Sequence, residues 1–484
     1  MVNLKSNATA QKNQKYSDDE ATLIHEATLK ILSQAGVGFE SERALDIFRR
    51  HGFQVDGSKV IIAENRVSDA LNQTPNRFTL HARNPDHSID ISRDTLSIAP
   101  TGGAPFINQI DGSIRSATMA DFELCCQLVQ TSKVLNLGGY LMVQPSDIEI
   151  ATGHLDMLAT YFKHCDKPII GASNSGLAAK QSLEMAALIF DGHDQLKKQP
   201  AMIMVVDAIS PLRFSAEQAD VIIEMASFHQ PLVISTMVMA GSTGPVSLAG
   251  VAALQNAEIL AGIVLAQLVS PGNPVVYGST SAPMDMKTTI SAVGAYETAM
   301  LSELTCKMAQ FYQLPGRSGG SLTDAHAVDS QALAEGTLLL ATVVQSGVNF
   351  IFQGCGQMAS YSSMSFEKWL IDEEICSNIC QLRKPIEISE ASIDAEFIIS
   401  VGSEGQYLTH PKTFNQFKNL SQPNLFNRDN YLKWTKLGAK RIDIVAHEQI
   451  AQCVSDYSKP NLEPTIKKAL DDYVLEEKTR RGAN

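Results

Sequence analysis

The sequence predicts an α/β fold, a (β/α)8 TIM barrel with an N-terminal α+β cap and a C-terminal helical extension. From residue 96 onward, short apolar β-like runs alternate with helical stretches, which is typical of a parallel sheet. There are eight of these runs, the number that closes such a barrel. The rival is a doubly wound open sheet. That fold usually carries a glycine fingerprint after its first strand, and Thr101-Gly102-Gly103 is not one.

The cap is predicted at residues 17–95, after a polar leader at residues 1–16 that we expect to be disordered. Its apolar residues first recur with helical spacing and then form short β-like runs. The predicted helices of the cap are residues 18–34 and 42–51, and its predicted strands are residues 60–62 and 78–81.

The barrel is predicted at residues 96–360, and each of its strands is an apolar run followed by a helical stretch. The eight predicted strands are residues 97–103, 135–143, 168–172, 202–208, 232–239, 274–280, 316–322 and 348–353. The clearest helices between them are residues 215–228, 252–268, 295–312 and 331–345.

The extension is predicted at residues 361–484, where the alternation of strand and helix stops. It is rich in helix and polar surface, and we expect it to pack beside the barrel. Its predicted helices are residues 366–380, 411–417, 441–457 and 463–477, and residues 385–401 are less regular.

Composition excludes some classes of partner. The formal net charge is −13 and the pI is about 5.3, whereas a nucleic-acid-binding protein needs a basic face for the phosphates. No uninterrupted apolar run reaches the roughly 18 residues that span a bilayer, and the polar N-terminus has no signal-peptide core. We therefore expect a cytoplasmic protein without nucleic-acid or membrane partners.

The eight cysteines form no Cys-x-x-Cys pair and are predicted to be reduced. Cys376 and Cys380 are four residues apart and could share a metal on one helix face. Since no third ligand lies nearby in the sequence, a place in the core is favoured and no zinc is predicted.

Active sites of such barrels lie at the carboxyl ends of the strands, and the polar stretch after the seventh strand is the densest there. Gly319 and Gly320 allow close backbone approach, and Asp324 and His326 follow them. The candidate catalytic residues are His326, Asp324 and Glu297, and the candidate substrate-binding residues are Asp207, Tyr140, Tyr277, Asp285, Phe352 and Gln353.

Each candidate also has a purely structural interpretation. The polar stretch could cap the next helix, and Asp207 could cap the turn before Pro211. Glu297 could interact with a helix dipole, and His326 could be an ordinary loop histidine. Aromatic residues at strand ends are more interesting as a set, because stacked π faces attract quaternary ammonium groups.

Two apparent cofactor motifs are incomplete. Asp191-Gly192-His193 resembles the start of the corrinoid-binding motif Asp-x-His-x-x-Gly, but the last position is Leu196. The glycine-rich segments lack the Lys-Ser/Thr of a P-loop. The chain is therefore predicted to carry neither its own corrinoid nor a nucleotide.

Several longer motifs, spread from about residue 18 to residue 474, resemble the trimethylamine:corrinoid methyltransferase family. In the barrel these are Ile209-Ser210-Pro211-Leu212 followed by Phe214, Pro245-Val246-Ser247-Leu248-Ala249-Gly250 with Asn256-Ala257-Glu258, Val269-Ser270-Pro271-Gly272-Asn273-Pro274-Val275, and Thr323-Asp324-Ala325 leading to Asp329-Ser330-Gln331. In the extension they are His410-Pro411-Lys412-Thr413-Phe414 with Leu425-Phe426-Asn427-Arg428 and Trp434.

The resemblance implies a barrel methyltransferase that moves a methyl group from a methylated amine to the Co(I) corrinoid (cobalamin) of a separate small corrinoid-binding protein, with no tightly bound cofactor of its own. It also implies that Gly103, Gly319, Gly320 and Gln331 face the corrinoid, and we expect a homo-oligomer. Trimethylamine-specific members carry pyrrolysine near the segment that ends here in His326. Since this chain has none, it resembles the branch that acts on quaternary amines, the glycine betaine methyltransferases.

The chemistry agrees with this choice. A quaternary ammonium is already activated, because its leaving group is a neutral tertiary amine that needs no proton. The protein must hold the cation, exclude water and aim one methyl at cobalt. The carboxylate of a betaine would need donors, either backbone amides at the glycines or a residue such as Arg317. The alternatives are a lyase or hydrolase that uses Asp324 and His326 as acid and base, and a non-catalytic quaternary-amine binder.

Overall fold

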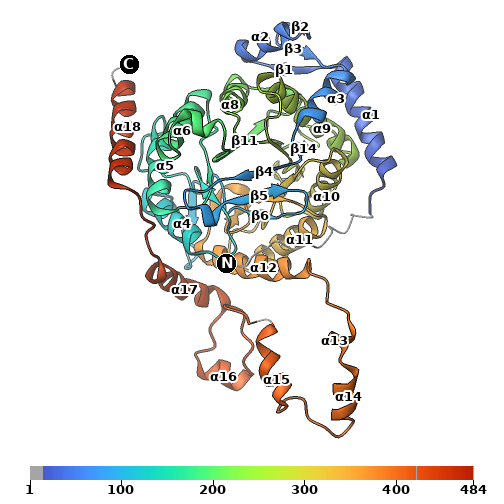
Figure 1. The fold of residues 1–484 in the computed structure, drawn as a ribbon, viewed down its shortest axis with the longest axis vertical. Helices are drawn as coiled ribbons and strands as arrows, with labels where there is room; N and C mark the ends of the chain where they lie inside the picture. Colours follow the sequence, from blue (N-terminus) through green and yellow to red (C-terminus); the bar gives the residue numbers. More distant parts are fainter. Residues whose placement is uncertain (1–14, 421, 483–484) are drawn as a thin grey trace.

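A computed structural model describes residues 15–420 and 422–482, and its centre is a closed barrel of eight parallel strands (Figure 1). The sheet order is β6-β18-β17-β15-β13-β11-β10-β9. Asn136 closes the ring, since its backbone N–H donates to Ile98 O and its Oδ1 accepts from Ile98 N, both at 2.9 Å. The strands are β6 (Ser97–Ile98), β9 (Gly138–Gly139), β10 (Ile169–Ile170), β11 (Met202–Ala208), β13 (Leu232–Thr236), β15 (Val275–Gly278), β17 (Gly316–Gly319) and β18 (Phe350–Phe352).

The predicted fold class is confirmed, and every predicted barrel strand contains one of these strands. Helices surround the barrel, and most begin at a residue whose side chain caps the first turn. Ser247, for example, accepts a hydrogen bond from Gly250 N at the start of α9. The surrounding helices are α4 (Met119–Thr131), α5 (Gly153–His164), α6 (Gly176–Ile189), α8 (Ala216–Ser227), α9 (Leu248–Val269), α10 (Tyr296–Phe311), α11 (Ser330–Gln345) and α12 (Phe366–Leu382).

Helix α9 is long and apolar enough, by length and composition alone, to cross a membrane, although no such segment is predicted from the sequence. Its polar residues interrupt every apolar run but leave the mean hydropathy high. In the structure 83% of the apolar window is buried inside the protein. Asn256 and Glu258 on this helix are fully buried and hydrogen-bonded. We therefore assign α9 to the core that packs against the barrel.

A hairpin closes the amino-terminal end of the barrel. Strands β4 (Arg77–Leu80) and β5 (Ile89–Ser92) are antiparallel and lie across the barrel in Figure 1. Leu80 and Ile91 are fully buried in one cluster with Val233 and Val276 of the barrel strands. The hairpin thus fills this end, so the carboxyl ends of the strands form the only side of the interior that faces outward in the described residues.

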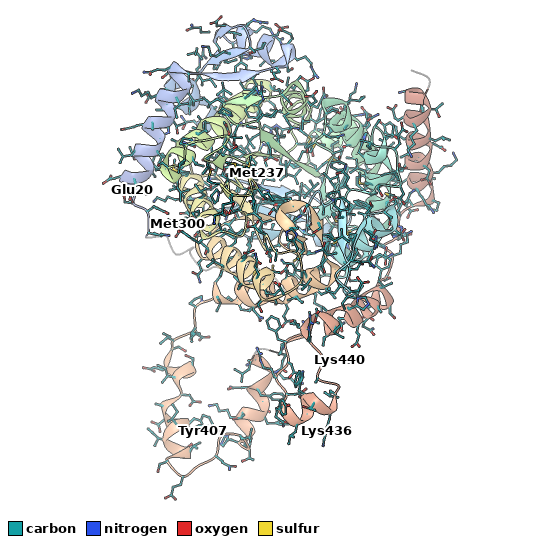
Figure 2. The ribbon with its side chains drawn as sticks, turned by 180° about the vertical axis from the view of Figure 1, so that it is seen from behind. Glu20, Met237, Met300, Tyr407, Lys436 and Lys440 are labelled. Atoms are coloured by element: carbon teal, nitrogen blue, oxygen red, sulfur yellow. The ribbon has the colours of Figure 1, made fainter. Side chains whose placement is uncertain are left out.

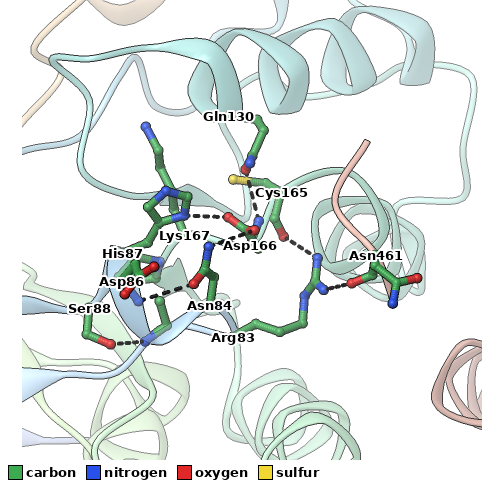
Figure 3. A network of polar contacts seen from close by, with 12 residues as sticks. Arg83, Asn84, Asp86, His87, Ser88, Gln130, Cys165, Asp166, Lys167 and Asn461 are labelled. Carbon is green, nitrogen blue, oxygen red and sulfur yellow. Dashed lines mark hydrogen bonds and ion pairs between the residues drawn. The ribbon is translucent and has the colours of Figure 1, made fainter. Parts of the chain in front are cut away.

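Polar contacts fix the hairpin turn in place (Figure 3). His87 Nδ1 lies 2.5 Å from Asp166 Oδ1, and Asn84 N donates to Asp166 O at 3.2 Å. Asp166 N in turn donates to Gln130 Oε1 of α4 at 3.0 Å. Arg83 donates to Cys165 O and to Asn461 O, which connects the turn to the C-terminal part of the chain.

The rest of the cap is a small sheet flanked by helices. Its strand order is β12-β1-β3-β2, and β12 (Arg213–Phe214) comes from the loop after barrel strand β11. Phe39 and Phe214 stack with centroids 5.1 Å apart. The other elements are α1 (Asp18–Gln34), β1 (Val37–Phe39), α2 (Glu42–Arg50), β2 (Gln54–Asp56), β3 (Lys59–Ile61) and α3 (Glu64–Gln73).

Part of the extension packs as expected and part does not. Helix α17 (Ile442–Asp456) packs on α12 and α4, and α18 (Pro464–Gly482) packs on α5 and α6. Residues 383–441, which we call the arm, extend away from the barrel in Figure 1 and contain no buried residue among those described. The arm helices are α13 (Glu390–Ile393), α14 (Ala395–Val401), α15 (Pro411–Gln416) and α16 (Tyr431–Lys436).

The expectation that the whole extension packs beside the barrel is therefore wrong for the arm, whose short helices bury no side chains of their own. The division into a cap at 17–95, a barrel at 96–360 and an extension at 361–484 stays a prediction. The predicted leader lies outside the described residues except for its last two, Lys15 and Tyr16.

Candidate active site

The barrel interior changes from apolar to polar along the strands. Near the hairpin, Val205, Val233 and Phe350 lie in the apolar cluster inside the barrel. Side chains two residues apart on a strand point to the same face. The next inward positions toward the carboxyl ends are Asp207 on β11, Ser235 on β13 and Phe352 on β18. A polar layer therefore lies above the apolar one.

Arg317 of β17 is the centre of this polar layer and is only 2% exposed. Its Nη1 donates to Ser235 Oγ at 3.1 Å and to Thr280 Oγ1 at 3.4 Å, and its Nη2 donates to Gln353 Oε1 at 3.1 Å. Its Nε has no hydrogen-bond partner in the described part of the chain. All three partners are neutral, so among the described residues the buried guanidinium has no ion-paired carboxylate.

Aromatic side chains flank the guanidinium. Phe352 lies under it, with Arg317 Cζ 5.7 Å from the ring centroid, a distance at which a cation is attracted to the ring. A Cβ at Gly102 would lie 2.6 Å from Phe352 Cζ, so the ring position requires glycine there. Burial raises the pKa of Tyr361 to about 12, and the charge of Arg317 opposes this rise.

The polar layer opens outward on one side. Asp207 is exposed although it follows Val205 on the inner face, and Met237 after β13 is 42% exposed. Figure 2 views the end opposite the hairpin and shows Met237 near the middle of the ring of helices. Burial lowers the pKa of Arg317, and the charge of Asp207 counteracts this. The mouth thus contains an exposed carboxylate and a buried guanidinium.

Comparison with known proteins identifies the family. The family model described as trimethylamine methyltransferase (MTTB) matches residues 4–482. The chain belongs to this methyltransferase family. The resemblance inferred from the motifs is therefore confirmed.

Characterised relatives cover nearly the whole chain. The chain is 37% identical to the glycine betaine methyltransferase of Desulfitobacterium hafniense, over 95% of this chain and 96% of the relative. It is 31% identical to the proline betaine:corrinoid methyltransferase of Eubacterium limosum, over 95% and 97%. It is 30% identical to a trimethylamine methyltransferase of D. hafniense, over 96% and 94%.

Among solved structures, this chain resembles the monomethylamine methyltransferase of Methanosarcina barkeri, with a TM-score of 0.53 and 12% sequence identity. The match covers 90% of this chain and 88% of that protein. At this identity the likeness shows the fold alone.

Two of the family-like motifs of this methyltransferase contact each other. Glu258 on α9 is fully buried and accepts hydrogen bonds from Ser210 Oγ at 2.8 Å and from Leu212 N at 2.7 Å. Thr236 Oγ1 donates to the same carboxylate. Burial raises the pKa of Glu258, and these hydrogen bonds oppose the rise. Glu258 thus holds the loop after β11, which begins just beyond Asp207, against the end of β13.

The carboxylate of Asp324 is engaged in hydrogen bonds that connect three loops, and its predicted catalytic role stays a prediction. Its carboxylate accepts hydrogen bonds from Val293 N and Gly294 N, each at 3.0 Å, and from Ser360 Oγ at 2.5 Å. These bonds join the loops that follow β15, β17 and β18. His326 is exposed on the same side of the barrel, and its carbonyl accepts from Asn108 Nδ2 at 2.8 Å.

Three predicted site residues lie away from the polar layer. Tyr277 faces outward and is fully buried, with its hydroxyl donating to Asn256 Oδ1 at 2.9 Å, so it is a core residue rather than a substrate contact. Asp285 is exposed and accepts from Lys287 N and Thr288 N, which holds a rim turn and lowers the pKa of its carboxyl. Glu297 lies in the first turn of α10, as its helix-dipole interpretation expected.

Tyr140 is half-buried. It packs against the main hydrophobic core and not against the apolar cluster inside the barrel to which the hairpin contributes. Burial raises the pKa of its hydroxyl. Of the predicted substrate-binding set, the structure therefore brings together Asp207, Phe352 and Gln353 around Arg317. Gln353 has a positive φ of 59°, which turns its side chain toward the guanidinium at the end of β18.

The predicted corrinoid-facing glycines serve backbone packing. A Cβ at Gly320 would lie 2.7 Å from Gly354 Cα, and one at Gly319 would lie 2.6 Å from Leu322 Cδ1. Gly103 has a φ of +83°, which favours glycine. Gln331 is exposed at the start of α11, where its side chain donates to Glu335 Oε1 at 2.9 Å. Whether any of them faces a corrinoid stays a prediction.

A buried ion pair supports the polar layer from behind. Lys368 Nζ and Asp372 Oδ2 on α12 are 2.7 Å apart, and both side chains are fully buried. Asp372 also accepts from Ser321 Oγ at 2.8 Å and from Gly356 N at 2.8 Å, in the segments after β17 and β18. The pair therefore fixes the strand ends next to Arg317 and Gln353.

All eight cysteines are free, and Cys376 and Cys380 are both buried in the core. Within residues 15–420 and 422–482, no three His, Cys, Asp or Glu side chains gather as metal ligands do.

Proposed function

We propose that this methyltransferase moves a methyl group from a quaternary amine to the Co(I) corrinoid of a separate small protein. The observation that carries the proposal is the mouth itself, where the exposed carboxylate of Asp207 belongs to the polar, partly aromatic layer around Arg317. A carboxylate and π faces suit a cation with no proton to donate. The relatives named for glycine betaine and proline betaine support the same substrate class.

The reaction needs no acid or base from the protein. The nitrogen–carbon bond breaks with its electron pair left on nitrogen, which becomes a neutral tertiary amine. The methyl group forms a bond with cobalt, which supplies the electron pair and is formally oxidised from Co(I) to Co(III). The side chains of this chain bind the cation, keep the site poor in water and fix the direction of one methyl group.

The hydrolase or lyase alternative is less well supported. An acid–base pair needs two groups within hydrogen-bond reach of one substrate. The Asp324 carboxylate is instead occupied by Val293 N, Gly294 N and Ser360 Oγ. A binder without turnover is disfavoured because the chain belongs to a family of methyltransferases.

The direct test uses the purified protein with a reduced corrinoid protein and a panel of methylated amines. We expect the spectrum to change from Co(I) to methyl-Co(III) with a quaternary amine, and the tertiary amine to accumulate. Trimethylamine turning over as fast as every quaternary amine would contradict the proposal. We further propose that the chain holds no corrinoid or metal of its own and is cytoplasmic.

His326 is expected to contribute at the mouth, where substrate and corrinoid would meet. Because it is exposed, its side chain can contact either of them without rearrangement of the core. His326→Ala should lower the methyl-transfer rate roughly tenfold, about 1.4 kcal/mol of barrier, without changing the melting temperature. The matched control is His193→Ala, which replaces an exposed histidine that follows α6 and pairs with Glu184 of that helix. Equal rates for both variants would make His326 an ordinary loop residue.

We also propose that the chain self-associates through the arm. Its helices are too short to be stable without packing, yet none of their residues is fully buried and their aromatic contacts lie within the arm itself. Both ends of the arm join helices that pack on the barrel. A second copy of the chain is always present in solution, so it is the best candidate to cover the arm. The large apolar side chains left exposed include Ile386, Ile388, Leu408, Phe414, Leu420 and Tyr431.

Light scattering tests the arm proposal. The unmodified protein should have a mass that is a multiple of the 52.5 kDa chain, and Leu408→Asp with Phe414→Asp should reduce it. Leu475→Asp, on the exposed face of α18, is the control that should leave the mass unchanged. A monomeric unmodified protein would contradict self-association.

A further inference from the structure

We propose that Arg317 is the residue that sets substrate specificity, by binding a carboxylate on the same molecule as the quaternary ammonium. The inference rests on the proposed function and adds the requirement for an anionic group. The substrate's carboxylate would bind beside Arg317 of β17, and its methyl-bearing cation would lie near Asp207 of β11.

The free hydrogen-bond donors of Arg317 identify the chemistry. A guanidinium has five N–H groups, and the contacts with Ser235, Thr280 and Gln353 use three of them. The Nε–H has no partner among the described residues, and Nη2, which shares one edge of the guanidinium plane with Nε, has a second N–H. That edge binds a carboxylate through two parallel hydrogen bonds.

The charge of Arg317 points the same way. A buried cation is stable in a protein when a counter-charge accompanies it. The oxygens around this guanidinium are neutral, and in the described residues no carboxylate forms an ion pair with it. The charge of Asp207 acts on Arg317 without a hydrogen bond between them among the described residues, and a substrate carboxylate would supply a negative charge in direct contact with a guanidinium that is 2% exposed.

The depths of the two charges orient the substrate. Arg317 is buried below the mouth, whereas Asp207 and Met237 are exposed at it. Strands β13 and β15 lie between β11 and β17 in the sheet, and the charge of Asp207 acts on Arg317, so we place a short zwitterion between the two residues. The carboxylate would enter first, and the methyl groups would remain on the side that a corrinoid protein can reach. A quaternary amine without a carboxylate would leave the Nε–H of Arg317 without an acceptor, and the exposed Asp207 would remain its nearest counter-charge.

The first arm of the test needs no variant. We expect the unmodified enzyme to methylate the corrinoid protein from glycine betaine at least ~100-fold more efficiently, as kcat/KM, than from tetramethylammonium or choline, because a buried polar group would be left unpaired. Equal efficiencies would overturn the inference while leaving the proposed function intact.

The second arm compares variants of two arginines, Arg317 and Arg213. Arg317→Gln should lower the efficiency with glycine betaine at least ~100-fold and that with tetramethylammonium less than threefold, and Arg317→Lys should be intermediate. Arg213→Gln removes an arginine whose side chain is 51% exposed and should change neither efficiency. A parallel loss for both substrates in Arg317→Gln would overturn the inference.

Calorimetry separates the two hypotheses. Binding of glycine betaine to the protein without its partner should be lost in Arg317→Gln and kept in Arg213→Gln. If no quaternary amine is turned over by the unmodified enzyme but this binding pattern holds, the proposed function fails and the carboxylate site stands. If Arg213→Gln and Arg317→Gln bind glycine betaine equally, the carboxylate site fails.

Discussion

Replacing Asp372 with alanine is expected to lower the free energy of unfolding by about 3–5 kcal/mol, because removal of one partner leaves a buried charge uncompensated. Lys368 and Asp372 are both fully buried on α12. Lys368 Nζ also donates to Ser321 O at 3.0 Å, but this neutral acceptor would not replace the charge of the lost carboxylate. The loss would also leave Ser321 Oγ and Gly356 N without their acceptor.

The chain contains a matched control for this substitution. Lys468 and Asp472 on α18 have the same spacing of four residues, but their side chains are 75% and 62% exposed. Asp472→Ala should change stability by less than about 0.5 kcal/mol, because water and salt screen the pair. Chemical denaturation of both variants measures the difference. A similar cost for Asp372→Ala and Asp472→Ala would show that the buried pair contributes no more than an exposed one.

A double variant tests the physical reason. Lys368→Met combined with Asp372→Leu removes both charges and keeps apolar volume, so it should be more stable than Asp372→Ala alone. If the double variant is the less stable of the two, then the hydrogen bonds that Lys368 donates to Ser321 outweigh the cost of its unpaired charge.

The barrel could be predicted from the sequence because its strands are buried on both faces. Such strands appear as uninterrupted apolar runs between turns, so their number and order are visible. The same property hides which side chains point inward. Tyr277 and Val276 are neighbours on β15 and equally apolar in pattern, yet Val276 faces the interior and Tyr277 faces α9. The prediction of Tyr277 as a substrate contact fails for this reason.

A functional role for Arg317 could be predicted from the sequence. A charged residue inside an otherwise buried strand needs a partner or a function, and Gly316-Arg317-Ser318 shows one. The hydrogen-bonding role of Asp324 could not be predicted from the sequence. The backbone amides that occupy it belong to Val293 and Gly294, about thirty residues earlier, and no pattern of side chains reveals them. The short strands in the loops at the mouth, such as β14 (Met239–Ala240) and β16 (Ala282–Pro283), have too few residues to show an alternation of apolar and polar side chains.

Glu258→Ala is expected to lower methyl transfer about 100-fold, since a displacement of about 1 Å at a reacting centre can have an effect of this size. The carboxylate holds Ser210, Leu212 and Thr236, and its loss would free the loop that follows Asp207. Each orphaned donor should also cost about 1–3 kcal/mol of stability.

Two variants separate position from stability. Glu258→Gln keeps the shape and one acceptor oxygen, so it should recover most of the transfer rate. Gln267→Ala on the same helix removes a buried side chain that donates to Asn273 O and accepts from Gly272 N, each at 2.8 Å, at the end of α9 away from the mouth. We expect it to lower the melting temperature as Glu258→Ala does but to leave the rate nearly unchanged. If both alanine variants lower the rate equally, general destabilisation explains the loss, and Glu258 does not position the mouth.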